Sequence, residues 1–173
     1  MKNLARATVI ALAVITTTAL PLPTGRAEAL TAVDCAALST PVYGATKADG
    51  TMVLTPNQQE AKNASKYGFI YSGVSFLASR TPESSLIAVH RLSRGSDFYY
   101  LSSPRNIQDA LAAGYVDQGV SFYAADVPAW CTAPVWGEKT ASGHRYFTQA
   151  QKDRADIEFY SAAHPVAGSP TSV

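Results

Sequence analysis

The residues of this chain that could perform chemistry are few and scattered. There are two cysteines, Cys35 and Cys131, and three histidines, His90, His144 and His164. No histidine has another histidine, a cysteine or a carboxylate at the spacing that metal ligands require. We therefore expect no metal site and no cofactor, and each histidine to be a surface or hydrogen-bonded side chain.

The carboxylates give a similarly weak signal for catalysis. Four of them lie near expected turns, where acidic residues commonly stabilise the turn itself: Asp97, Asp117, Asp126 and Glu138. A small secreted hydrolase that uses Asp97 and Glu138 remains an alternative, because glycoside hydrolysis needs two carboxylates facing one site. A secreted inhibitor or protein-interaction module is a further alternative.

Aromatic side chains are the one compositional hint of a ligand, since the chain has nine tyrosines and two tryptophans. Flat rings exposed at a surface can stack on sugar faces, and a tyrosine hydroxyl adds a directional contact. The candidate ligand-binding rings lie on strands or beside turns: Tyr43, Tyr99, Tyr123, Trp136 and Tyr146. The leading hypothesis is a non-catalytic module that binds a glycan or cell-envelope polymer. The alternative, that these rings fill the core of a small fold, stays open.

The start of the chain has the pattern of a secretory signal peptide. Lys2 and Arg6 precede a short apolar run at 7–15, and Ala27-Glu28-Ala29 forms a small-residue cleavage site. The apolar run is too short to span a membrane. We therefore expect residues 1–29 to be removed near Ala29, the protein to be secreted, and no membrane insertion.

The cysteine pair predicts a disulfide. An even number of cysteines in an exported chain favours pairing, here of Cys35 with Cys131. The alternative is a catalytic thiol, which would need a histidine partner whose position the sequence does not give.

The charge balance bears on the kind of partner. The formal net charge is only +1, with 14 basic and 13 acidic residues. This leaves no basic footprint for nucleic acid, so we expect no nucleic-acid partner. A secreted protein is an alternative partner to the glycan, and we expect a monomer.

A four-residue motif organises the rest of the chain. Gly73-Val74-Ser75-Phe76 returns unchanged as Gly119-Val120-Ser121-Phe122, 46 residues later. A period of this length is typical of a repeated supersecondary unit. Period-two alternation predicts that valine and phenylalanine of the motif face the core while serine faces outward. Three units follow from this period, at about 41–79, 86–125 and 133–167.

Each unit has the pattern strand, turn, strand, helix, strand. The turns carry a glycine at Asp49-Gly50, Arg94-Gly95 and Ser142-Gly143. Hydroxyl residues then cap helices expected at 57–67, 105–113 and 150–159: Thr55, Ser103 and Thr148. Gly68 and Gly114 end the first two helices.

The third unit lacks the Gly-Val-Ser-Phe motif. Its closing strand is expected either at Val166-Ala167 or from the N-terminal segment 29–38. The cysteine pair would hold that segment near the third unit and therefore favours the second option. Residues 168–173 are expected to be a disordered tail.

These units resemble a repeat of unknown function in exported bacterial proteins, the DUF5648-like repeat with consensus V-Y-R…G-x-H-F-Y-T…G-Y…G-x-A-F-Y. The second unit resembles it most, through Val89-His90-Arg91, Phe98-Tyr99-Tyr100, Gly114-Tyr115 and Gly119 to Ala124. The resemblance implies a secreted, repeat-built module and supplies no catalytic residues.

The expected fold is α+β: a single domain at 30–167 with three ββαβ units and one disulfide. Closure around a pseudo-threefold axis, as in a β-trefoil or prism, would hide sheet edges that separate units leave exposed.

Overall fold

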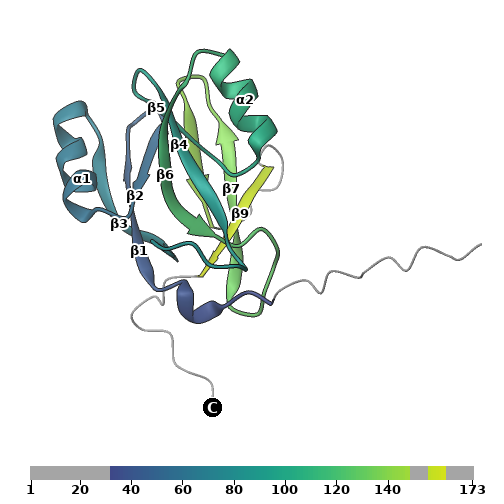
Figure 1. The fold of residues 1–173 in the computed structure, drawn as a ribbon. Coiled ribbons are helices and arrows are strands. Elements are labelled where there is room, and N and C mark those ends of the chain that lie inside the picture. Colours follow the sequence, from purple (N-terminus) through teal and green to yellow (C-terminus); the bar gives the residue numbers. More distant parts are fainter. Residues whose placement is uncertain (1–31, 149–155, 163–173) are drawn as a thin grey trace, which may run out of the picture. The chain divides into compact units, whose positions relative to one another are not determined.

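The computed structural model describes residues 32–148 and 156–162, which lie in one compact unit, Thr31–Val173. This part of the chain is mostly β, with few helices (Figure 1). Its strands are β1 (Thr40–Thr46), β2 (Met52–Thr55), β3 (Ile70–Ala78), β4 (Ile87–Arg94), β5 (Asp97–Leu101), β6 (Val116–Ala124), β7 (Thr132–Lys139), β8 (His144–Phe147) and β9 (Asp156–Ala162). The helical elements are η1 (Cys35–Ala37), α1 (Gln58–Asn63), η2 (Ala64–Tyr67) and α2 (Pro104–Ala112).

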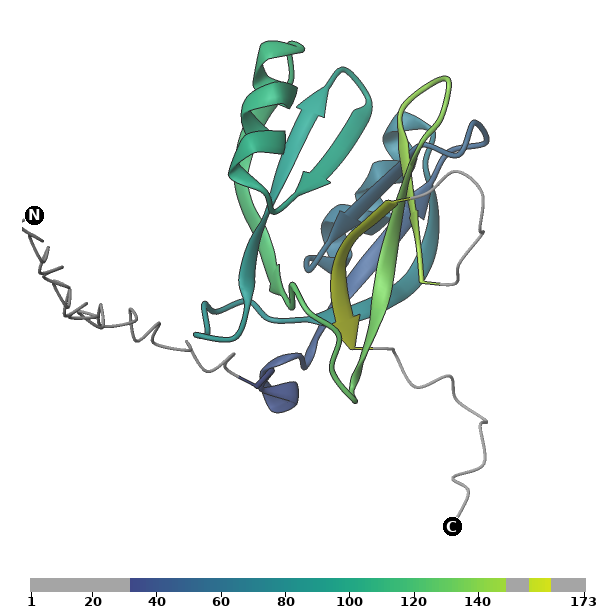
Figure 2. The ribbon, with the colours of Figure 1, turned by 90° about the vertical axis from the view of Figure 1, so that its right-hand side faces the viewer.

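The strands form three antiparallel groups of three: β1–β3, β4–β6 and β7–β9. In each group the first strand pairs with both of the others. The pair Leu77–Ala162 joins the first and third groups into a sheet of order β2-β1-β3-β9-β7-β8, while β5-β4-β6 is a separate sheet (Figure 2). Isolated bridges, Ser79–Tyr123 and Ala125–Tyr160, tie the second group to the other two. The described strands form no closed barrel.

The last strand of each group carries a β-bulge at the same place. Val42 pairs with Phe76 and Tyr43 with Val74, so Ser75 is an extra residue opposite that step. Ser121 is the extra residue in β6, and Glu158 in β9. The bulge breaks the period-two alternation. The prediction that Val120 is buried with Phe122 is therefore wrong, since Val120 is 44% exposed.

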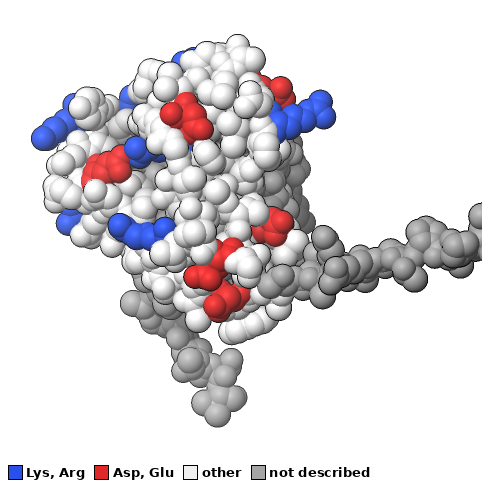
Figure 3. Space-filling model, in the orientation of Figure 1, with Lys and Arg blue, Asp and Glu red and all other residues white. Residues whose placement is uncertain are grey.

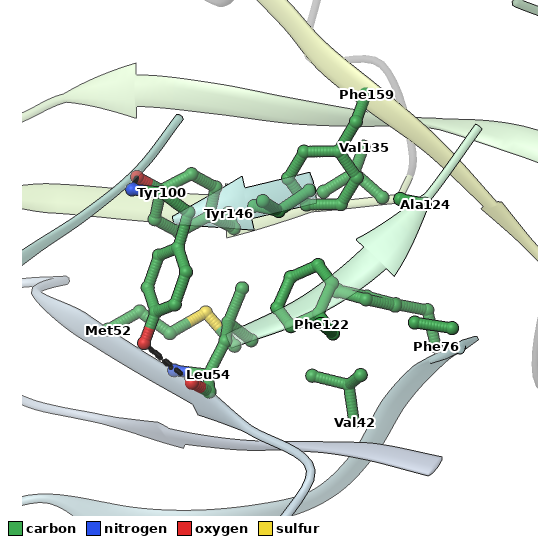
Figure 4. Close-up of a cluster of buried hydrophobic side chains, with 12 residues drawn as sticks. Val42, Met52, Leu54, Phe76, Tyr100, Phe122, Ala124, Val135, Tyr146 and Phe159 are labelled. Atoms are coloured by element: carbon green, nitrogen blue, oxygen red, sulfur yellow. Dashed lines mark hydrogen bonds between the residues drawn. The ribbon is translucent and has the colours of Figure 1, made fainter. Parts of the chain in front are cut away.

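Three phenylalanines make the centre of the core, one from each group. The rings of Phe76, Phe122 and Phe159 are buried and in pairwise contact, with centroids 5.6, 5.8 and 5.5 Å apart (Figure 4). Each phenylalanine pairs across its sheet with a fully buried valine: Val42, Val89 and Val135. Burying an aromatic or valine side chain contributes about 1.5–3 kcal/mol, so each of these six side chains is expected to stabilise the fold by that amount.

The third group is completed by β9, which corrects the expectation that the N-terminal segment supplies its closing strand. Residues 156–162 form a strand that pairs with β7, although 156–159 were expected to end a helix. Ile157 and Phe159 take the places of the valine and phenylalanine of the repeated motif, without its glycine. The described part of the N-terminal segment, 32–38, forms η1 and no strand. The alternative Val166-Ala167, the tail at 168–173 and most of the expected helix lie outside the described residues.

The disulfide between Cys35 and Cys131 is confirmed, with the two Cα atoms 6.0 Å apart. It joins η1, just ahead of β1, to the residue before β7. Because both cysteines are consumed by this bond, the alternative of a catalytic thiol is wrong.

The helix caps follow the sequence closely, with one shift. Ser103 caps α2 by accepting the N–H of Asn106, and Pro104 occupies the first turn, as predicted. In the first group the cap is Asn57, whose side chain accepts the N–H groups of Gln59 and Glu60. The predicted cap, Thr55, instead donates to the carboxylate of Glu60.

Charged groups are interspersed over the face seen in Figure 3, between wide areas without charge. No helix within 32–148 and 156–162 is long and apolar enough to cross a membrane.

Candidate binding groove

A groove of about 530 Å³ separates the first helix from the turn of the second strand group. Residues from α1 and η2 make one wall, and the other wall comes from Gly95 and Ser96 of the β4–β5 turn. The floor is formed by Val53, Phe69 and Phe98. Its volume lies within the roughly 300–1,000 Å³ typical of small-molecule sites.

Aromatic rings give the groove its apolar surface. Phe69 is almost fully buried and contacts half-buried Phe98, with centroids 6.1 Å apart and planes at 55°. Tyr67 stands at the rim and is 74% exposed. The groove therefore combines a largely buried aromatic floor with one exposed ring at its rim.

Side-chain amides supply the polar part of the wall that α1 forms. The Oδ1 of Asn57 is used in the helix cap, which leaves its amide NH₂ group outside that cap. Gln59 donates to the Oδ1 of Asn63, four residues on along the same helix. The amide groups on this wall are thus held by their own helix before any ligand arrives.

Glu60 is the carboxylate of the groove, and it is already paired. Its two oxygens accept hydrogen bonds from the Arg91 guanidinium and the Thr55 hydroxyl, both at 2.6 Å. Burial works to lower the pKa of Arg91, but Tyr100 and Glu60 together raise that pKa above its ordinary value. Arg91 therefore stays charged, and the pair adds no net charge to the site.

The matching place between the second and third groups holds no such groove. Tyr115 and His144 contact there at 6.2 Å and 64°, closely matching Phe69 and Phe98. The ring of Tyr99 packs against both, stacked on His144 at 3.9 Å and 8° and tilted against Tyr115 at 5.9 Å. In the first group the position of Tyr99 is occupied by Val53. The groove therefore exists because valine leaves the space that a tyrosine ring fills in the next group.

Beneath Tyr99, a buried polar cluster joins the second and third groups. Asp97 accepts hydrogen bonds from the Tyr115 hydroxyl and from the backbone N–H of His144, whose Nδ1 lies 3.1 Å from the same carboxylate. Burial works to raise the pKa of Asp97, but the hydrogen bonds from His144 and Tyr115 outweigh it and lower that pKa. Burial, and then the bond to Asp97, raise the pKa of Tyr115 to about 12.

Gly143 makes room for this cluster. A Cβ at position 143 would lie 2.6 Å from the Oδ1 of Asp97. The sequence predicts Gly143 as a positive-φ turn residue like Gly50 and Gly95, but only the latter two have positive φ. Its role is therefore to admit the carboxylate.

Comparison with known proteins gives a family but no activity. The family described as "Domain of unknown function (DUF5648)" matches residues 41–161, which is more than half of the chain. The chain belongs to this family. The match confirms the resemblance predicted from the sequence. No curated protein and no solved structure matches the chain.

The aromatic residues that the sequence singled out are not brought together in this member of the family. Tyr43 lies near Tyr71, Tyr99 is stacked on His144, and Tyr123 is bridged to Ser79. Trp136 is half-buried, with its indole nitrogen enclosed. Tyr146 is buried, and its ring contacts Tyr100 edge-on at 5.2 Å, so it is part of the core. None of these five residues lines the groove.

Sequence reasoning missed the residues that do line it: Tyr67, Phe69, Phe98 and Asn57. The sequence difference that accompanies the groove is Val53 at the place of Tyr99, and this equivalence follows from the strand registers rather than from the sequence.

The proposed acid–base pair and a metal site find no support in the geometry of the described residues. Asp97 is enclosed in its polar cluster, and Glu138 is bonded to Arg145 at 2.6 Å. Within 32–148 and 156–162, no group of three or more metal-ligating side chains comes together.

Proposed function

We propose that this protein is a secreted, non-catalytic module that binds a glycan or cell-envelope polymer through the groove beside α1. The observation that carries the proposal is the aromatic floor of Phe69 and Phe98 set against a wall of side-chain amides. Sugar rings present apolar C–H faces and polar edges, and a site of this composition is complementary to both.

The state of the groove before binding favours affinity. Phe69 and Phe98 are held by each other and by a cation over each ring: Lys47 lies 4.7 Å from the Phe69 centroid and Arg91 5.8 Å from that of Phe98. A floor that is fixed in advance loses little conformational entropy when a ligand arrives.

The absence of catalysis in this proposal rests on the carboxylates. Hydrolysis of a glycosidic bond uses two carboxylates about 5–10 Å apart across the substrate. Glu60 is the single acidic residue among the described residues that line the groove, and both of its oxygens are engaged. The groove therefore supports binding better than turnover.

We also infer that the three strand groups are ββαβ repeats of about 46 residues arranged around a pseudo-threefold axis. The equivalent bulges at Ser75, Ser121 and Glu158 support this arrangement, as do the three core phenylalanines. Export by a signal peptide at 1–29 is part of the proposal. The Cys35–Cys131 disulfide supports it, because such bonds persist in oxidising compartments.

A polysaccharide-binding screen tests the proposal. Purified exported protein would be incubated with insoluble cell-wall material and a panel of polysaccharides, and the bound fraction measured. Tyr67→Ala is expected to weaken binding by about tenfold or more, the usual effect of losing one stacked ring. Trp130→Ala is the matched control, since Trp130 is 92% exposed and lies outside the groove.

Retention by no polysaccharide would overturn the proposed function. Loss of binding in Trp130→Ala, with Tyr67→Ala unaffected, would contradict the groove and move the site to the loop at 126–131.

A further inference from the structure

A second, smaller cavity adjoins the groove across a shared wall. It has a volume of about 200 Å³ and lies where the β2–α1 connection meets β4 and β6. Asn57 and Glu60 line both the groove and this cavity. The two spaces are therefore neighbours on either side of the same two side chains.

The chemistry of the second cavity differs from that of the groove. Three of the residues that line it have polar side chains of different kinds: exposed Gln118, Ser121 and Arg91. None of the described residues that line this cavity is aromatic. Amides and hydroxyls both donate and accept hydrogen bonds, while a guanidinium donates only. This surface suits the hydroxyl groups of a sugar, whereas the groove suits its apolar face.

The shared wall is fixed in place. Glu60 is held by Arg91 on one side and by Thr55 on the other, and Asn57 is held by the cap of α1. A ligand that crosses this wall therefore meets donors and acceptors at set positions. The groove alone is large enough for a drug-sized molecule, so a ligand that also reaches the second cavity must be longer.

We propose that the groove and the second cavity form one continuous path that passes over the side chains of Asn57 and Glu60, and that the path takes an internal stretch of a chain of N-acetylated sugars. This inference rests on the proposed function and specifies its ligand. In the groove, small apolar side chains (Val53 and Ala64) lie beside the amides of Asn57 and Asn63. An acetamido group needs both, because its methyl packs against apolar surface while its N–H and C=O form hydrogen bonds.

Oligomer length provides the test. The probes are β-1,4-linked oligomers of N-acetylglucosamine with two, four and six sugars, titrated calorimetrically against the exported protein. The six-sugar oligomer is expected to bind about tenfold more tightly than the two-sugar oligomer, the effect of one or two added hydrogen bonds. Gln118→Ala should remove this gain and leave the two-sugar affinity unchanged. Gln108→Ala makes the same change on exposed α2, outside both cavities, and should preserve the gain.

Equal affinity at all lengths would overturn the continuous path, as would a Gln118→Ala variant that weakens short and long oligomers alike. If no oligomer binds while another polysaccharide is retained in the screen, the inference fails and the proposed function stands. If nothing in the screen is retained, the proposed function itself fails.

Discussion

Val53 and Tyr99 occupy the same place in neighbouring strand pairs. Val53 pairs with Ala45, three residues after buried Val42, and Tyr99 pairs with Leu92, three residues after buried Val89. The tyrosine ring fills a space that the valine leaves open. One side chain therefore decides whether this junction between two strand groups is a packed contact or a groove.

Val53→Tyr is expected to close the groove in the way that Tyr99 closes the matching place. Binding to the retained polysaccharide should fall at least about tenfold, while the added ring costs stability by no more than about 1–3 kcal/mol. Binding by pull-down and unfolding by urea titration measure the two effects separately. Val53→Ile adds a single methylene and should keep most of the binding. A Val53→Tyr protein that folds and binds normally would exclude the groove as the site.

Tyr100 ties the first two groups together through its hydroxyl, which donates to the carbonyl oxygen of Leu54 at 2.6 Å and accepts from its N–H at 2.8 Å (Figure 4). Tyr100→Phe leaves both buried backbone groups without this partner. We expect a loss of about 2–4 kcal/mol in the free energy of unfolding, at about 1–2 kcal/mol for each group. Half-buried Tyr123→Phe is the control, expected to change stability by less than about 0.5 kcal/mol. Equal losses in the two variants would contradict the special role of Tyr100.

Asp97 makes the stability depend on pH. Its pKa is lowered in the folded protein from the ordinary value of 3.8, so its contribution is fully present above about pH 4–5 and is lost as the pH falls through the folded pKa. The pKa of Tyr115 is raised to about 12, so its contribution is present below about pH 10 and is lost as the pH rises toward 12.

Asp97→Asn should therefore be less stable than the unmodified protein at pH 7, and the difference should shrink as the pH falls from about 5 to about 2. Urea unfolding of both proteins across this range measures it. The exposed Asp109→Asn is the control and should show no such pH-dependent difference. A gap that stays constant down to pH 2 would show that the Asp97 charge contributes nothing.

The sequence predicts the start and end of a helix well where a single residue type is needed at that position. Ser103-Pro104 starts α2 and Gly68 ends η2, because a cap and a positive φ are properties of few residue types. The disulfide follows from composition alone. The strand β9 is missed because the repeated motif contains glycine, whereas β9 keeps only its bulge and its buried phenylalanine, Phe159.

The groove could not be predicted in the same way, because it depends on a space between two groups. Alternation predicts that Phe98 and Tyr99 point to opposite faces of their strand, but not that Phe98 meets Phe69 from another group. The sequence favours Tyr146 as a ligand contact by residue type, yet Tyr146 fills the core. Which residue a side chain contacts across two groups is decided by the tertiary fold, and the periodicity of a strand or a helix does not predict it.

The position of Phe159 has a consequence for how the chain acquires its structure. This ring contacts both Phe76 and Phe122, and it lies within the last strand that the structure describes. The first two groups can pair their own strands as they are synthesised, but their central rings lack a neighbour until β9 has been made. Productive folding therefore waits for β9, and a protein shortened before residue 159 would present an open hydrophobic face to chaperones and proteases.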